Sequence, residues 1–394
     1  MILVISAVFP PEPIVSANLS YDIATELSNK GNKVTVISPK PSRPYGHVFV
    51  NETNSAIKFD HIKADSYISP KSRLFGRFIE SYSFGKYSKK FISEHADEIE
   101  VMYINTWPLL AQYFAIKTAK KYSIPIILHI QDIYPESLAK KLPIFLSQIV
   151  QLSFVRFDKF NLKNATKIIA ISSNMKKFLE SKRKIDSQKI AVVRNWQNDE
   201  KFIGFKPKER KGKNRFTFMY VGSISASAGV DHIINAFKAI DNKDNIRLVI
   251  AGSGSDKEKC KKLASNSRSI EFWDAPYHEI AEIQSKADVL LLSLKKGVGL
   301  TASPSKFTAY LFSKKAVIAS LDLESDTAKS IEESGCGFVC LPEDITNLSN
   351  TMDEVSRIPL EKLDEMGQKG YQYALNNLSK KENLKKITEI IQNN

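Results

Sequence analysis

The sequence predicts an α/β protein made of two doubly wound domains that face a central cleft. Three observations support this prediction. The chain has 394 residues, which is too long for one ordinary core and suits two domains of about 150 to 200 residues. Short apolar runs alternate with longer amphipathic runs in both halves, which is the pattern of parallel βαβ units. A charged stretch at residues 205–214, FKPKERKGKN, is the best candidate for a linker between the halves.

The first half contains apolar, β-branched runs that we interpret as buried strands. They are ILVISAV (2–8), KVTVIS (33–38), VMYIN (101–105), PIILHI (125–130), KIIAIS (167–172) and IAVVRN (190–195). Amphipathic runs lie between them, such as the helix expected from Leu19 to Asn29, which Gly31 would end. Residues 1–205 are therefore expected to form the first domain.

The second half repeats the pattern. Its expected strands are FTFMYVGSI (216–224), IRLVIAGSG (246–254), SIEFWDA (269–275), DVLLLSL (288–294), KAVIAS (315–320) and GFVCL (337–341). Residues 206–375 form the second expected domain, and residues 376–394 a helix that crosses back to the first. Ligands of such sheets bind outside the carboxyl ends of the strands, so the cleft between the domains is the expected active site.

Composition narrows the class of protein. Hydrophobic residues make up 43% of the chain, and no segment approaches the roughly 18 uninterrupted apolar residues of a membrane span. The opening MILVISAVFPP lacks the basic region and cleavage site of a signal peptide, so we expect a cytoplasmic protein. The three cysteines, Cys260, Cys336 and Cys340, are too few for a disulfide framework and are expected to be reduced packing residues.

The formal charge of +14 indicates an anionic partner or a solvated basic surface. No zinc-finger spacing, RNA-binding aromatic signature or compact arginine tract occurs, and lysines are spread over nearly every expected helix, so no nucleic acid partner is expected. Residues 71–91, KSRLFGRFIESYSFGKYSKKF, interleave aromatic and basic side chains. This segment is either a helix that lies on an anionic membrane or a core helix with a solvated basic face.

A loop of small residues follows the first strand of the second half, in YVGSISASAGVDHIINAF (220–237). Small residues between Gly222 and Gly229 would let backbone N–H groups approach a phosphate at a helix N-terminus. The turn in IAGSGSDKEK lacks the third glycine of a dinucleotide fingerprint, which disfavours a nicotinamide dehydrogenase.

Lys306 stands between a Ser-Pro-Ser turn and a helical run in SPSKFTAYLFSKKAVIAS (303–320). No D-x-D pair and no HExxH motif is present, so we expect no metal and no cofactor, and protein groups must neutralise any diphosphate. Lys306 is either the positive charge for that task, assisted by a helix dipole, or an ordinary solvated lysine.

A polar group lies at the end of one apolar strand of the first half, in PIILHIQDIYPES (125–137). His129 and Gln131 share one face of the strand, and such a histidine is either catalytic or a hydrogen-bonded core residue. Asp132, at the strand end, is the preferred polar participant in catalysis.

Together these stretches resemble glycosyltransferase family four, which has the GT-B fold of two Rossmann-like domains, and within it the bacterial O-antigen and capsule transferases. The resemblance also rests on four further stretches, which follow one another along the chain: FPPEPIVSANLSYDIATELSNKGNKVTVISPKPSRPYG, KIIAISSNMKKFL, VVRNWQNDEKF and ADVLLLSL. It implies a nucleotide-sugar donor on the second domain, an acceptor on the first, independence of metal ions, and retention at the anomeric carbon. It also implies that Lys306 binds the donor diphosphate and stabilises charge on the departing nucleotide, without a covalent nucleophile.

The resemblance places further site residues on the matching positions of this chain. The expected donor contacts are Gly222, Ser223, Ile224, Asn195, Gly252, Gly299, Leu300, Thr301, Ser303, Pro304, Ser305, Asp326 and Thr327. The expected acceptor contacts are Val15, Ser16, Ala17 and Asn18. Lys306 and Asp132 are the expected catalytic residues.

This chain also departs from the family pattern. The two glutamates of the E-x7-E motif are replaced by Thr301 and Ala309, and Asp326 is our substitute for a polar donor contact. The Arg and Lys that are common in the first phosphate loop fall at Ser223 and Ala228.

The paired glycines of the first-domain loop are replaced by Ile14 and Val15, which leaves Ser16 and Ala17 for backbone contact with the sugar or phosphate.

The leading functional prediction is a retaining glycosyltransferase that moves a sugar, from a UDP-sugar, to a lipid-linked oligosaccharide at the inner face of the cytoplasmic membrane. One alternative is a nucleotide-sugar epimerase on the same scaffold. The other is a catalytically degenerate protein that binds nucleotide-sugars, which the missing glutamates suggest.

Overall fold

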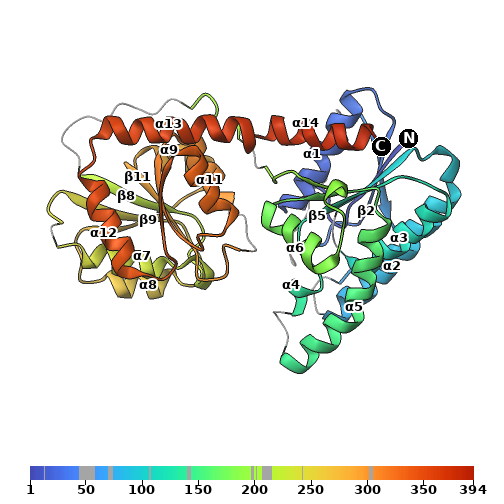
Figure 1. Ribbon diagram of the computed structural model, residues 1–394, viewed down its shortest axis with the longest axis horizontal. Helices are drawn as coiled ribbons and strands as arrows, with labels where there is room; N and C mark the ends of the chain where they lie inside the picture. Colours follow the sequence, from blue (N-terminus) through green and yellow to red (C-terminus); the bar gives the residue numbers. More distant parts are fainter. Residues whose placement is uncertain are drawn as a thin grey trace. The chain divides into compact units, whose positions relative to one another are not determined.

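The computed structural model describes residues 1–12, 14–43, 58–69, 74–105, 108–139, 143–196, 199–200, 202–205, 215–241, 243–300 and 305–394 (Figure 1). The chain divides into two compact units. The first unit is Met1–Asn195 with Asn383–Asn394, and the second is Trp196–Glu382.

The first unit contains a parallel sheet with the strand order β3-β2-β1-β4-β5-β6-β7. The strands are β1 (Ile2–Ile5), β2 (Val34–Pro39), β3 (Asp60–Ala64), β4 (Val101–Asn105), β5 (Ile126–Ile130), β6 (Lys167–Ala170) and β7 (Ile190–Val192). The six strands expected from apolar runs are all present: β4 spans the expected residues, β2 is shifted by one residue, and the other four are shorter than expected. Strand β3 was not expected, because its residues Asp60 to Ala64 contain no apolar run.

Helices cover this sheet, and its apolar side chains form the core of the unit. They are α1 (Val15–Asn29), α2 (Leu74–Glu94), α3 (Leu109–Lys121), α4 (Glu136–Ala139), α5 (Ile144–Asn164), α6 (Ser173–Arg183) and α14 (Lys380–Gln392). Helix α14 joins the unit from the far end of the chain, and the ammonium of Lys30, the C-cap residue of α1, donates to the Thr388 hydroxyl at 2.7 Å.

The second unit contains a parallel sheet with the order β10-β9-β8-β11-β12-β13. Its strands are β8 (Phe216–Val221), β9 (Ile246–Ala251), β10 (Ile270–Trp273), β11 (Val289–Ser293), β12 (Ala316–Ser320) and β13 (Gly337–Cys340), and each matches an expected strand. The strand order reverses between β8 and β11. In open sheets of this kind, ligands bind at such a reversal, beyond the carboxyl ends of the strands.

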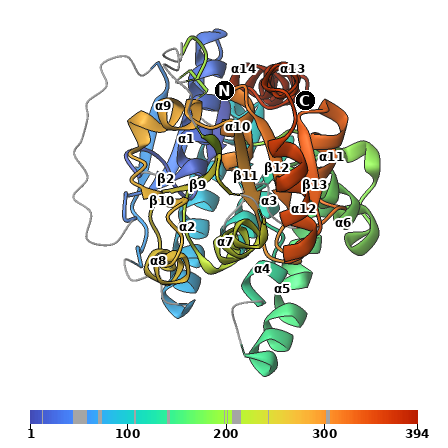
Figure 2. The same ribbon diagram turned by 90° about the vertical axis from the view of Figure 1, so that its left-hand side faces the viewer.

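Side chains of the second sheet alternate between two cores because successive residues of a strand point to opposite faces. Phe218 and Tyr220 enter one core, and Met219 and Val221 enter the other. Helices α7 (Val230–Ala239), α8 (Lys257–Ala264) and α12 (Ile345–Ser356) cover the first face, and α7 and α12 lie side by side on it (Figures 1 and 2). Helices α9 (Ile280–Ser285), α10 (Ser305–Phe312), α11 (Asp326–Ser334) and α13 (Leu360–Asn377) cover the other.

The units divide earlier than the linker predicted from charge. Residues after Asn195 already belong to the second unit because Phe202 is buried in its core, with its ring stacked on Phe312 at 6.3 Å between centroids. The expected C-terminal segment likewise begins in the second unit, and the part from Asn383 onward belongs to the first. The charged stretch itself lies largely outside the described residues.

No helix in the described part of the chain is both long and apolar enough to cross a bilayer. The three cysteines are buried and free, and burial raises the pKa of each thiol, as expected of reduced packing residues.

Candidate active site

The loops that follow β8 and β9 run against each other at the carboxyl edge of the second sheet. The N–H of Ile224 donates to the carbonyl of Ser253 at 2.8 Å. A Cβ atom at Gly252 would lie 2.1 Å from the carbonyl oxygen of Gly222, and one at Gly254 would lie 2.2 Å from that of Ile224. Glycine is required at both positions because two backbones touch, so Gly252 has a packing role whether or not it also contacts a donor.

The loop after β8 presents the side chains of two serines, Ser223 and Ser227, to solvent. Ser223 is exposed, whereas Ile224 is fully buried, so Ile224 can offer a ligand only its backbone. Gly229 has φ +61° immediately before α7, and a Cβ atom there would lie 2.7 Å from the Ser293 hydroxyl oxygen. The small-residue loop is thus packed tightly at Gly229, where α7 begins, whereas the Ser223 side chain is accessible to solvent and to a ligand.

Lys306 lies in the first turn of α10, and its ammonium reaches the end of β8. Its Nζ is 2.6 Å from the Tyr220 hydroxyl oxygen and 4.5 Å from the centroid of that ring. A Cβ atom at Gly222 would lie 3.2 Å from Lys306 Cε, so this glycine leaves room for the lysine. Burial lowers the pKa of Lys306 to about 8, and the described residues place no carboxylate against it. Lys306, Gly222 and Ser223 therefore lie together, and the lysine can neutralise an anion.

The loop that precedes α10 is held by a buried carboxylate. Asp322, after β12, accepts hydrogen bonds from the N–H of Gly297 at 2.9 Å and of Gly299 at 3.1 Å. Leu300 is exposed. The other expected donor contacts of this segment, Thr301, Ser303 and Pro304, lie outside the described residues, and Ser305 begins α10.

The first turn of α11 lies beside this loop, because a Cβ atom at Gly299 would be 3.5 Å from Ser325 Cβ. Ser325 caps the helix by accepting from the N–H of Ala328 at 3.1 Å. Asp326 and Thr327 follow, and both side chains are buried. Their contact with a donor stays a prediction.

In the first unit, the expected acceptor loop is the first turn of α1, which begins at Val15. Ala17 is fully buried, and the N–H groups of Ala17 and Asn18 both donate to the carbonyl of Ile14. The Ala17 N–H is therefore occupied within the helix. Ser16 is half-buried and Asn18 is exposed, so these two side chains are the better placed for an acceptor.

The polar group at the end of β5 divides into a buried part and an exposed residue. His129 is fully buried, its Nδ1 is 2.7 Å from the Tyr103 hydroxyl, and burial lowers its pKa to about 3. It is neutral at ordinary pH and is a hydrogen-bonded core residue, which decides between the two alternatives. Gln131 links His129 to Asn195, whose amide donates to Gln131 Oε1 at 2.5 Å. Asp132 is exposed.

Asn195 is the last residue of the first unit before the chain enters the second. Its Oδ1 is buried and has no hydrogen-bond partner among the described residues. An acceptor oxygen in that state suits a ligand N–H or O–H, and the donor contact predicted for Asn195 stays a prediction.

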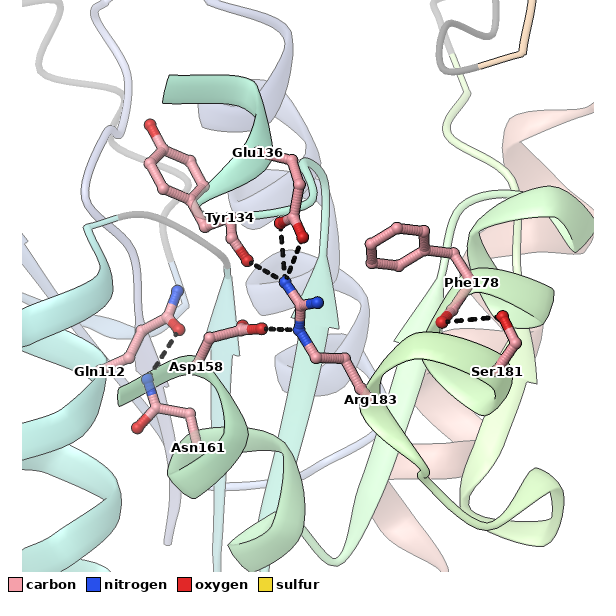
Figure 3. A network of polar contacts seen from close by, with 8 residues as sticks. All are labelled: Gln112, Tyr134, Glu136, Asp158, Asn161, Phe178, Ser181 and Arg183. Atoms are coloured by element: carbon pink, nitrogen blue, oxygen red, sulfur yellow. Dashed lines mark hydrogen bonds and ion pairs between the residues drawn. The ribbon is translucent and has the colours of Figure 1, made fainter. Parts of the chain in front are cut away.

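A buried arginine fixes the turn that follows Asp132. Arg183, at the end of α6, donates through Nε to Asp158 at 2.5 Å and through a terminal nitrogen to both Glu136 oxygens, at 2.8 and 2.7 Å (Figure 3). The same nitrogen donates to the Tyr134 carbonyl at 2.9 Å. The network ties α4, α5 and α6 together. Sequence reasoning missed it, although Arg183 continues a buried stripe with Met175 and Leu179 at a four-residue spacing.

A second buried ion pair lies in the same unit. The guanidinium of Arg43, after β2, donates to both carboxylate oxygens of Glu80 in α2, at 2.7 and 2.8 Å. The backbone N–H of Arg43 donates to the Glu12 carboxylate at 2.9 Å. Burial raises the pKa of Glu80. This pair fixes α2 against the loops that follow β1 and β2.

Among the described residues, no group of three or more His, Cys, Asp or Glu side chains could hold a metal ion. Independence of metal ions stays a prediction.

Comparison with known proteins decides the class. A model described as Glycosyltransferase Family 4 matches residues 16–201, and one described as Glycosyl transferases group 1 matches residues 202–373. The chain belongs to the GT-B glycosyltransferases. The expectation of a glycosyltransferase is thereby confirmed, whereas retention and independence of metal ions stay predictions.

Individual relatives of this glycosyltransferase are distant. A probable glycosyltransferase, WbjE of Pseudomonas aeruginosa, is 24% identical over 66% of this chain, and the match spans 64% of that protein's length. The structure of Alr3699/HepE of Anabaena in complex with UDP has a TM-score of 0.70 at 12% identity, with 100% of both chains covered. The structure of WaaG, a glycosyltransferase involved in lipopolysaccharide biosynthesis, has a TM-score of 0.67 at 15% identity, also with 100% of both chains covered. At these identities the two structures establish the fold of the glycosyltransferase.

Proposed function

We propose that this chain is a retaining glycosyltransferase that moves a sugar from a UDP-sugar to a lipid-linked oligosaccharide in the biosynthesis of a surface polysaccharide. The observation that carries the proposal is Lys306, a partly buried ammonium without a carboxylate partner among the described residues. It lies next to a glycine loop, where the strand order of the sheet reverses. A donor diphosphate is the kind of anion that fits such a site.

The proposed chemistry breaks the bond between the anomeric carbon and the donor phosphate oxygen. Both electrons leave with the nucleoside diphosphate, and Lys306 stabilises the negative charge that develops on it. The acceptor hydroxyl forms the new glycosidic bond from the same face, and its proton passes to a donor phosphate oxygen, which accounts for retention. Asp132 is the carboxylate that we propose to contact the acceptor.

Two relatives support the finer parts of the proposal. HepE forms a complex with UDP, which favours a uridine donor here. WaaG is involved in lipopolysaccharide biosynthesis, which favours a lipid-linked saccharide as acceptor. The O-antigen and capsule assignment and the position at the inner membrane face rest on the sequence resemblance.

Activity should survive removal of divalent ions. The positive charge at the diphosphate comes from Lys306 and from backbone N–H groups in this proposal, so a divalent ion is not needed. Turnover measured in EDTA should equal turnover in magnesium. Complete loss in EDTA that magnesium or manganese restores would contradict a metal-independent mechanism.

Helix α2 has the surface that a membrane-bound acceptor would require. One face is buried and includes Glu80 and Phe84. The other face is exposed and places aromatic side chains near the N-terminus and lysines farther along, at Phe75, Phe78, Tyr82, Lys86 and Lys89. A buried face and an exposed face with basic and aromatic side chains fit either alternative, a helix on an anionic membrane or a core helix with a solvated basic face, and contact with a membrane is our proposal. Of the basic residues expected there, Lys71 and Arg73 lie outside the described residues, and Arg77 is half-buried.

Neutralising lysines of this face should weaken binding to anionic vesicles. In the triple variant Lys86→Gln, Lys89→Gln and Lys90→Gln, each lost charge should cost about 1 kcal/mol near such a surface. Co-sedimentation with phosphatidylglycerol vesicles at low salt measures the effect, and wild-type binding should fall as salt rises.

The control removes three exposed lysines from α8, Lys259, Lys261 and Lys262, and should bind as the wild type does. A separate variant, Phe75→Ser with Phe78→Ser, distinguishes insertion from attraction. Equal binding by all four proteins would exclude α2 as the membrane contact.

A screen of nucleotide-sugars by thermal shift tests the proposed function. A ligand at about a hundred times its dissociation constant adds about 2.7 kcal/mol of stability. The stabilising donor is then incubated with and without lipid-linked acceptors. Transfer of sugar to an acceptor supports the proposal, conversion of the donor alone supports the epimerase, and binding without turnover on any acceptor supports the degenerate binding protein.

A further inference from the structure

The hydroxyl of Tyr220 joins two parts of the proposed donor site. It donates to the carbonyl oxygen of Ser223 at 2.6 Å, within the loop after β8, and it lies 2.6 Å from Lys306 Nζ. Tyr220 itself is fully buried, and its ring packs in one core of the second unit. The hydroxyl is therefore held in place by the fold.

The direction of these hydrogen bonds follows from the atoms. A tyrosine hydroxyl has one proton, and Tyr220 uses it for the hydrogen bond to the Ser223 carbonyl. The lone pairs of the hydroxyl oxygen therefore face the ammonium. Lys306 donates one of its three N–H groups to Tyr220 and keeps two for a ligand. The contact thus orients the lysine and leaves most of its hydrogen-bonding capacity available.

The lysine crosses the end of strand β8 to reach this hydroxyl. Helix α10 packs on one face of the sheet, through residues such as Phe307 and Tyr310, whereas Tyr220 packs on the other. The route passes Gly222, which has no Cβ atom to obstruct it. A flexible four-carbon side chain is thus directed by a rigid partner on the opposite side of the sheet.

We propose that Tyr220 is a positioning residue for catalysis. Its hydroxyl holds the Lys306 ammonium and the loop after β8, at Ser223, in the positions that bind the donor diphosphate. This inference rests on the proposed function of Lys306. The competing explanation is that the hydroxyl only stabilises the fold, by satisfying the Ser223 carbonyl.

A double-mutant cycle separates the two explanations. The proteins are wild type, Tyr220→Phe, Lys306→Ala and the double variant, assayed with the donor and acceptor that the function screen identifies. If Tyr220 acts through the lysine, Tyr220→Phe should lower kcat by about tenfold in the wild-type background, since hydrogen bonds to charged groups are the strong ones. It should have no further effect in the Lys306→Ala background.

Tyr310→Phe is the matched control. Its hydroxyl is equally buried, donates to the Val221 carbonyl and accepts from the Val221 N–H, both at 2.9 Å, and no contact with Lys306 is present among the described residues. Both variants remove one buried hydroxyl that makes its hydrogen bonds near the end of strand β8, although Tyr310 itself belongs to α10. Tyr310→Phe should lower thermal stability while its kcat stays much closer to that of the wild type.

A second measurement is independent of turnover. The pH dependence of acetylation of the Lys306 amine, followed by mass spectrometry in the full chain, reports the pKa of the ammonium. Tyr220 is the titratable side chain that the described residues place against it. Loss of the hydroxyl removes a hydrogen bond to the charged form, so half-labelling should occur at lower pH in Tyr220→Phe and at unchanged pH in Tyr310→Phe.

The outcomes distinguish this inference from the proposed function. Wild-type turnover in Lys306→Ala would overturn the role of the lysine and, with it, that of Tyr220. If Lys306→Ala is impaired but Tyr220→Phe loses equally in both backgrounds, or leaves the labelling profile unchanged, the positioning role alone is wrong. Should Tyr220→Phe not fold, Gly222→Ala disturbs the position of the same lysine, because its Cβ atom would lie 3.2 Å from Lys306 Cε, and the same cycle applies. An equal loss in both backgrounds would then count against the inference.

Discussion

Replacing Lys306 by alanine should reduce turnover by about a hundredfold or more, the loss seen when one preorganised donor is removed from a charge-stabilising site. The ammonium should act mainly as negative charge develops on the leaving nucleotide, so kcat should fall more than substrate binding. Steady-state kinetics with the identified donor and acceptor measures the loss.

Folding should not suffer in this variant. Burial already disfavours the charged form of Lys306, and its pKa of about 8 shows the direction of that cost. Thermal stability should therefore be unchanged or slightly higher. Lys314→Ala is the matched control, since its ammonium also lies 4.5 Å from a tyrosine ring centroid, that of Tyr371. The control should keep wild-type turnover, and a folded Lys306→Ala enzyme with full activity would remove the lysine from the mechanism.

Replacing Arg183 by methionine should cost about 3 to 5 kcal/mol of stability, because it leaves the buried carboxylate of Asp158 and the half-buried one of Glu136 without their partner. The loss of the guanidinium should affect Asp158 more than Glu136, since burial already raises the pKa of Asp158 to about 6 even with the guanidinium present. Chemical denaturation followed by circular dichroism measures the loss. Lys176→Ala on the same helix removes a half-buried pair with Glu180 at 3.9 Å, which lies at the surface and should cost less than about 1 kcal/mol.

The pH dependence identifies the cause of the Arg183 effect. The folded-state pKa of Asp158 lies above its unfolded value, so the folded state binds the proton more tightly and gains stability as pH falls below about 6. Without Arg183 that pKa should rise further, and protonation should remove part of the penalty. The deficit of Arg183→Met should be smaller near pH 4 than near pH 7. A deficit independent of pH would mean that packing, and not charge, holds the turn after Asp132.

Most of the fold could be predicted because buried parallel strands are apolar throughout. The six strands in the second unit are mainly apolar, with Arg247 in β9 and Glu271 in β10 as charged exceptions, and each was expected. Strand β3 was missed because its Asp60, His61 and Lys63 side chains interrupt any apolar run, and in the described part of the chain it is an edge strand paired with β2. The boundary near residue 196 was missed because charge placed the linker at residues 205–214, whereas Phe202, which precedes that stretch, already packs in the second core.

The candidate site was predicted less completely because its contacts join residues far apart in the sequence. Lys306 was identified from its turn and from the family resemblance, but its partner Tyr220 is 86 residues away and reads as an ordinary strand residue. Gly252 was assigned to donor binding, whereas the approach of the Gly222 backbone already requires a glycine there. Ala309 occupies one position of the missing glutamates. Its side chain is apolar and buried in the core, so it offers a donor no polar contact.

A calorimetric titration with UDP measures whether Lys306 holds the donor diphosphate. Wild type, Lys306→Ala and Lys314→Ala are titrated under identical conditions, after each is shown to be folded. If the lysine has this role, Lys314→Ala should bind UDP as the wild type does, and Lys306→Ala should bind about tenfold more weakly or worse, as expected when a charge-assisted contact is lost. Equal UDP affinity in wild type and Lys306→Ala would contradict this role.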